Sequence, residues 1–159
     1  MFILVLTIAT LYVSKTRLVL NGKLSAIEFP LVIGFSVFFL FVLTSTYDFF
    51  GVYLALEGLS LTLYVLAAIL NYSIISIEAA IKYFSLGSIA SGVLLYGVSL
   101  LFGIVGSLDF LSVQLFLGSQ DFVSLWEVRF ALVLILFGFF FKLSAFPCHW
   151  WVADVYEGV

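Results

Sequence analysis

Residues 130–147 read FALVLILFGFFFKLSAFP and place a lysine, Lys142, at the end of a long apolar run. A helix that crosses a hydrocarbon layer about 30 Å thick needs about 20 mostly apolar residues. Lys142 lies about 14 residues into such a helix at 1.5 Å per residue, and therefore past the midplane. Pro147 lacks a backbone donor and breaks helices. The stretch predicts a membrane helix that carries a lysine inside the bilayer, close to a break.

The composition of the whole chain is that of an integral membrane protein. Of its 159 residues, 65% are apolar and 9% are charged, against roughly 25% charged residues in a soluble domain. The mean hydropathy is +1.32. The net charge of −3 is spread without a basic run, which excludes nucleic acid as a partner. We predict an all-α fold, because the apolar runs are continuous rather than alternating as in β barrels.

The apolar runs and the polar turns between them predict a single membrane domain, a bundle of about five transmembrane helices. In the fourth run, Gly87 with Ser91 and Ser88 with Gly92 repeat small residues at four-residue spacing, which lets helix backbones approach closely in lipid. Residues 147–159 are expected to lead into a helix completed elsewhere. The predicted spans are about 1–20, 29–45, 49–70, 80–105 and 128–146, with an interfacial loop at 106–127 that contains a short amphipathic piece.

Charged side chains inside these runs are the first candidate functional residues. Glu57 lies roughly 10 to 12 Å inside the membrane at 1.5 Å per residue. At that depth an acid or a lysine costs roughly 2.5 to 3.5 kcal/mol and commonly marks an ion path or a proton relay. A buried Glu57–Lys142 pair is a proton switch, because each charge favours the ionised form of the other and separation readies the lysine to lose its proton. The alternatives are a carboxyl that only packs helices, a static ion pair, and a lysine that snorkels to the interface.

Lys82 and His149 are further candidates for a relay. Lys82 stands near an end of its span, where it is an interfacial anchor, unless the helix begins near Ser76 and draws it inward. His149 can ionise near neutral pH, as a relay member or as an interfacial hydrogen-bonding group. The chain has one cysteine, Cys148, and one histidine, so it offers neither an internal disulfide nor a cluster with metal-ligand spacing. We expect the chain itself to bind no cofactor and no metal.

Three stretches carry motifs that occur together in one family. FKLSAFPCHWWVADVYEG is similar to FKLS-x-x-PFH-x-W-x-x-DVYEG, LALEGLSLTLYVLAA to L-x-x-E-L-x-SLPLYVL, and EAAIKYFSLGSIASGVLLYG to EA-x-x-KYF-x-LGA-x-ASG-x-LLYG. The chain therefore resembles subunit 2 of respiratory complex I, the NADH:ubiquinone oxidoreductase, an antiporter-like membrane subunit. The motifs keep their order and cover roughly the last two thirds of the chain. Gly58, Thr62 and Cys148 replace the family's leucine, proline and phenylalanine.

The resemblance implies a role for each charged candidate. Glu57 and Lys142 are the family's glutamate–lysine pair, with the lysine on a broken helix. Lys82 approaches the pair from the helix that follows Glu57, and His149 lies along the hydrophilic axis. These residues are thought to form part of a half-channel that moves protons when quinone is reduced elsewhere. The chain is then a redox-inactive, proton-pumping subunit of NADH:ubiquinone reductase, in a complex that holds FMN, iron–sulfur clusters and ubiquinone in other places.

The resemblance also implies partners and a location. Family members continue past DVYEG with a second inverted repeat, and each repeat needs about five helices for a half-channel. We expect a fragment or the amino-terminal part of a split subunit, with a separate chain carrying the remainder. Neighbouring membrane-arm subunits and lipids, including cardiolipin, are further partners. Richness in Phe, Tyr, Ile and Leu fits an AT-rich organelle genome, so we expect the mitochondrial inner membrane rather than a bacterial plasma membrane. The alternatives are a subunit of a multisubunit cation/proton antiporter and a structural membrane scaffold.

Overall fold

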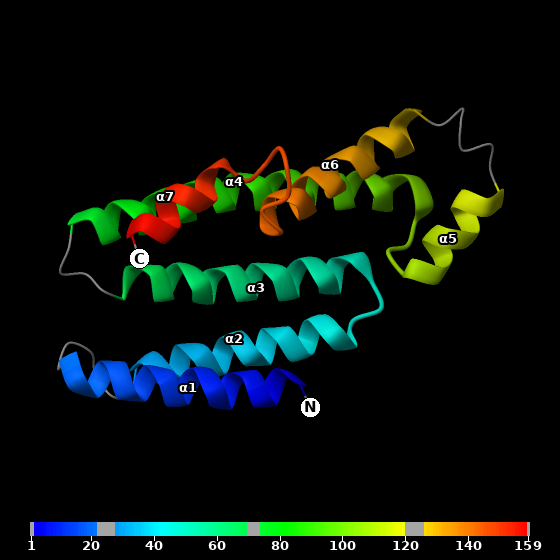
Figure 1. Ribbon diagram of the computed structural model, residues 1–159. Coiled ribbons are helices and arrows are strands. Elements are labelled where there is room, and N and C mark those ends of the chain that lie inside the picture. The colour runs from blue at the N-terminus through cyan, green and yellow to red at the C-terminus, as the bar shows by residue number, and fades with distance from the viewer. Residues whose placement is uncertain (1, 22–27, 70–73, 120–125, 159) are drawn as a thin grey trace.

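The computed structural model describes residues 2–21, 28–69, 74–119 and 126–158, and the regular elements in these ranges are helices. Figure 1 shows α3 between two groups, with α1 and α2 on one side and α4, α6 and α7 on the other. The predicted all-α architecture is confirmed. The helices are α1 (Phe2–Asn21), α2 (Glu28–Ser45), α3 (Phe49–Ala68), α4 (Ile74–Val105), α5 (Phe110–Ser119), α6 (Trp126–Lys142) and α7 (Trp150–Gly158).

Three of the described helices, α2, α3 and α4, are long and apolar enough to cross a membrane. In α1 the described apolar part is Ile3–Val13. The broken region after α6 limits that helix to 17 residues. A polytopic membrane bundle is therefore confirmed, with its clearest spans in the middle of the chain.

The first turns of α4 begin earlier than the sequence predicts. The helix starts at Ile74 instead of near residue 80, so Lys82 lies about two turns inside it. Ser76 is buried, and its hydroxyl donates to the carbonyl of Ala67 on α3 at 3.3 Å. This contact with the preceding helix explains why polar residues before the apolar run are helical.

A helix cap, and not the proline, ends α6. The predicted span extends to residue 146, but α6 ends at Lys142. Ser144 adopts a left-handed φ of 55°, and its amide donates to the carbonyl of Phe141 at 3.1 Å. The amide of Ala145 donates to the carbonyl of Phe140 at 2.8 Å. These two bonds form a Schellman motif, so the helix break begins directly after the lysine.

The predicted interfacial loop at 106–127 contains a helix of its own, α5. Gly106 turns the chain after α4 with a φ of 78°, a left-handed conformation that favours glycine. Val113 of α5 is buried against the core, whereas Leu111 and Leu115 are exposed. Residues 120–125 of this loop lie outside the described part of the chain.

Two turns at one end of the bundle are joined through the backbone. The amide of Phe49 donates to the carbonyl of Leu108 at 3.1 Å, and that of Phe110 to the carbonyl of Tyr47 at 3.2 Å. The rings of Phe49 and Phe110 meet edge to face with centroids 4.9 Å apart. The start of α3 is therefore fixed relative to α5.

The start of α3 gives a first testable prediction. Asp48 is its N-cap, and its carboxylate accepts a hydrogen bond from the amide of Gly51 at 2.8 Å. Because losing an N-cap side chain costs about 1 kcal/mol, Asp48→Ala should lower the free energy of unfolding by about that amount. Asp48→Asn keeps the acceptor and is the matched control. Thermal unfolding in mild detergent, followed by circular dichroism, measures both; equal losses would contradict the capping role.

The fourth helix is the centre of the fold, because α3, α5, α6 and α7 all pack against it. Of the two predicted small-residue pairs, Gly87 and Ser91 are buried, whereas Ser88 and Gly92 are exposed. Gly87 faces the hydroxyl of Tyr64 on α3, and a Cβ added there would overlap it. The buried pair therefore brings α3 close to α4. The main core lies on the α4–α5–α6 side and contains Leu94, Val98, Leu101, Val113, Ala131 and Ile135.

Candidate charged site in the membrane helices

The structure brings Glu57 and Lys142 together from two helices far apart in the sequence. Glu57 lies in the ninth position of α3, about 12 Å from its start, and Lys142 is the last residue of α6. The Lys142 Nζ lies 3.6 Å from Oε2 of Glu57, with the lysine side chain 13% exposed and the glutamate side chain 27% exposed. The two charges thus form a shielded ion pair within apolar helices.

The two charged atoms of this pair face each other at 3.6 Å, slightly beyond hydrogen-bond distance. Its Nζ and Oε2 atoms are buried, and neither has a hydrogen-bond partner within the described residues. A buried charge pair without further hydrogen bonds gains little over its desolvation cost. Moving the proton from lysine to carboxylate removes both charges at once, and separating the partners favours that neutral state. The arrangement suits a group that gives up and regains a proton.

Close packing of α2 on α3 positions the glutamate. Gly58 follows Glu57, and a Cβ at that glycine would overlap the ring of Phe39 on α2. One turn further on, the Ser60 hydroxyl donates to the backbone carbonyl of Glu57 at 2.9 Å. Gly58, which stands where the resemblance implies a leucine, thus lets an aromatic ring of α2 pack closely against α3.

An aromatic stack positions the lysine. Phe141, the residue before Lys142, stacks on Trp151 of α7 with ring centroids 5.3 Å apart. Trp151 stacks in turn on Tyr83 of α4 at 4.9 Å, and Tyr83 meets Tyr64 of α3 edge to face at 4.6 Å. The last turn of α6 is therefore packed, through one continuous aromatic cluster, against the three other helices around the site.

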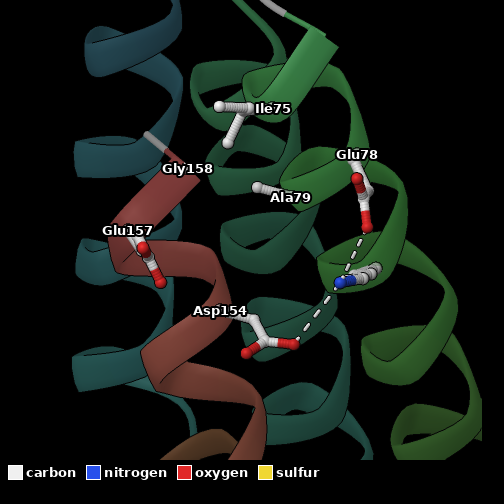
Figure 2. A pocket seen from close by; sticks show the side chains of 7 residues that line it. Ile75, Glu78, Ala79, Asp154, Glu157 and Gly158 are labelled. Carbon is white, nitrogen blue, oxygen red and sulfur yellow. Dashed lines mark hydrogen bonds and ion pairs between the residues drawn. The ribbon is translucent and has the colours of Figure 1, made fainter.

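Lys82 belongs to a second charged cluster. Its Nζ lies 2.9 Å from Oε1 of Glu78 and 3.5 Å from Oδ2 of Asp154. Figure 2 shows Glu78 on α4 and Asp154 on α7 pointing toward the same side chain, with dashed lines marking both ion pairs. The structure therefore pairs Lys82 with these two carboxylates, and the approach of Lys82 to the Glu57–Lys142 pair stays a prediction.

The remaining candidate, His149, lies in the segment between α6 and α7. Its side chain is exposed, and its ring packs against Phe146 with centroids 5.8 Å apart. The described ion pairs and hydrogen bonds do not join this ring to Glu57 or Lys142, so a relay role for His149 stays a prediction. Within the part of the chain that the structure describes, no group of three His, Cys, Asp or Glu residues is placed to hold a metal ion.

Two residues of the second cluster, Glu78 and Asp154, were not among the candidates predicted from the sequence. Glu78 precedes Lys82 by four residues, a spacing that places both on one helix face. The sequence pattern alone could therefore have predicted this ion pair. Asp154 stands on a different helix, and its approach to Lys82 depends on the docking of α7. Its carboxylate lies in the DVYEG stretch, which served only as a family signature.

Comparisons with known proteins identify the family of the chain. Residues 46–159 match the family model described as NADH:quinone oxidoreductase/Mrp antiporter, TM. The chain is 40% identical, over 98% of its length, to NADH-quinone oxidoreductase subunit N of Magnetococcus marinus. It is 43% identical, over 91% of its length, to subunit N of Herminiimonas arsenicoxydans. The chain spans 31% and 29% of these two relatives.

Solved structures show the same fold. Respiratory complex I from Thermus thermophilus with bound aureothin contains a chain that aligns with a TM-score of 0.68 and 36% identity, over 82% of this chain and 28% of that one. The membrane-bound sulfane sulfur reductase, an archaeal respiratory membrane complex, aligns with a TM-score of 0.76 and 25% identity, over 99% of this chain and 32% of that one. Both matches are to respiratory membrane complexes.

Proposed function

The chain belongs to the NADH:quinone oxidoreductase/Mrp antiporter family, and we propose that it forms part of an antiporter-like membrane-arm subunit that translocates protons during NADH:quinone oxidoreduction. The redox reactions take place in other subunits. The observation that carries the proposal is the shielded Glu57–Lys142 pair, 3.6 Å apart, between membrane helices. Intramembrane ionisable residues that pair with one another commonly mark proton relays.

The pair moves a proton through a change in its separation. While the partners are close, the carboxylate of Glu57 holds Lys142 in its protonated form. When Lys142 moves away, its ammonium gives the proton to an acceptor further along the membrane arm, and Glu57 takes up a proton from the opposite direction. Because α6 ends directly after Lys142, this lysine stands at the junction between α6 and the turn that leads to α7. When the partners come together again, the proton passes from Glu57 to Lys142, which restores the first state.

The finer assignment is also a proposal. The motifs favour the subunit 2 type, whereas the curated relatives are bacterial proteins named subunit N. We propose as partners the remainder of the subunit, expected on a separate chain, and the neighbouring membrane-arm subunits. Membrane lipids, cardiolipin among them, complete the surroundings. The proposed location is an energy-conserving inner membrane. The amino-acid composition favours a mitochondrial membrane, whereas the bacterial origin of the relatives favours a bacterial one.

A second candidate follows from the breadth of the family, which includes Mrp antiporters. A subunit of a cation/proton antiporter would use the same glutamate–lysine pair without any link to NADH. The two functions differ in the proteins that accompany the chain.

Purification of the tagged chain in mild detergent tests the proposal. We expect NADH-oxidising subunits and the polypeptide that completes the fold to co-purify, and the preparation to reduce a quinone analogue with NADH. An unrelated tagged multi-span membrane protein from the same cells is the control. Recovery of cation/proton antiporter subunits without NADH oxidation would favour the second candidate, and recovery of neither set would leave a scaffold as the explanation.

A further inference from the structure

The short helix α7 is docked along the first turns of α4. Figure 1 shows the two helices side by side. The ring of Trp151 stacks on Tyr83 at 4.9 Å, and Gly158 sits on Ala79, where an added Cβ would overlap the alanine. Between them Val155 is buried. These positions of α7 lie on one helix face, and they meet α4 in antiparallel order.

One charged contact reinforces this docking. Asp154 of α7 reaches Lys82 of α4 at 3.5 Å, while Glu78, on the same helix as the lysine, lies nearer at 2.9 Å. The three side chains line a cavity of about 140 Å³, to which Glu157 also contributes. Lys82 is therefore shared between two carboxylates, and only the contact with Asp154 joins two helices. If Lys82 pairs with Glu78 alone, α7 loses its charged contact with α4, while the ion pair within α4 stays in place.

The position of α7 is linked to the position of Lys142. Phe141, Cys148, Trp151 and Val155 belong to one core cluster with Ala90 of α4. The connecting turn is also hydrogen-bonded, since the amide of Cys148 donates to the carbonyl of Ala145 at 2.7 Å. The end of α6, the turn and α7 thus form one packed unit, so a shift of α7 along α4 moves the helix end that carries the lysine.

We propose that Asp154 is a positioning residue for the proton relay: its ion pair with Lys82 fixes α7 on α4 and thereby sets the separation between Lys142 and Glu57. Glu78 is the alternative partner that holds Lys82 when α7 shifts. The inference rests on the proposed function, because the separation of the pair matters only if the pair moves protons.

The test uses the assembled complex in proteoliposomes, with electron transfer and proton translocation measured together. Asp154→Asn removes the charge and keeps the size of the side chain. We expect an unchanged NADH:quinone rate and at least about a twofold fall in protons translocated per electron, in line with mutations that alter coupling without touching the reacting groups. Asp154→Glu should restore the ratio. Glu157→Gln is the matched control, because this acid lines the same cavity while the ion pairs of Lys82 go to Glu78 and Asp154.

Glu57→Gln, measured in parallel, separates the two proposals. Normal translocation in Glu57→Gln would refute the proposed function itself. Defective Glu57→Gln together with a normal ratio in Asp154→Asn would refute the positioning role alone, as would equal defects in Asp154→Asn and Glu157→Gln. If Asp154→Asn does not assemble, Asp154→Ser is measured in its place: a lowered ratio supports the ion pair, and a normal ratio overturns the positioning role.

Discussion

In the assembled complex, Glu57→Gln should reduce proton translocation through this subunit about tenfold or more, because a positioned acid–base group contributes about 10²–10⁴ in rate. Glutamine keeps the shape of the side chain but cannot carry the charge that faces Lys142 at 3.6 Å. Proton uptake by proteoliposomes, followed with a pH-sensitive dye during NADH oxidation, measures the effect. Glu127→Gln is the matched control, since this glutamate is exposed in the first turn of α6.

A double variant distinguishes a relay from a static ion pair. Removing one partner of a buried pair costs about 3–5 kcal/mol, whereas replacing both by uncharged groups is often neutral. Glu57→Gln combined with Lys142→Met should therefore regain the stability and the assembly lost in the single variants. If the pair carries protons, translocation stays low in the double variant. Recovery of translocation together with stability would show that the pair only holds helices together.

The charged pair could be predicted from the sequence because a membrane restricts where charges can lie. Glu57 and Lys142 each interrupt an apolar run at a depth from which they cannot easily reach water. Two opposite charges at that depth are most stable when they meet. The family motifs then placed both residues on helices of one bundle. Depth thus singles out both residues as candidates, the family motifs join them as a pair, and the structure adds the distance and the shielding of the pair.

The ends of the helices could not be predicted in the same way. Ser144 supplies the left-handed residue of the cap after α6, where a glycine is the usual signal. Without that signal, Pro147 was the first visible helix breaker, and the predicted end fell too late. The early start of α4 depends on the contact of Ser76 with α3, and the Lys82–Asp154 pair depends on the docking of α7. These features arise from tertiary contacts, which a local pattern does not contain.

The contact between α4 and α6 should be highly sensitive to one added methyl group, at Gly97. A Cβ at this position would lie 2.9 Å from Cγ1 of Ile135, and 3.0 Å from both the carbonyl oxygen of Ala131 and the amide nitrogen of Ile135. Backbone atoms cannot rotate away as a side chain can, so the two helices must separate. Gly97→Ala should lower the free energy of unfolding by about 1–3 kcal/mol, the usual cost of overpacking.

A glycine elsewhere on the same helix gives the matched control for this prediction. Gly92 has no atom within 4 Å of an added Cβ, so Gly92→Ala should be neutral or stabilising by up to about 1 kcal/mol, the difference in helix propensity. Thermal unfolding of the detergent-solubilised complex measures both variants. A Gly97→Ala complex as stable as Gly92→Ala would contradict the close contact of the two helices.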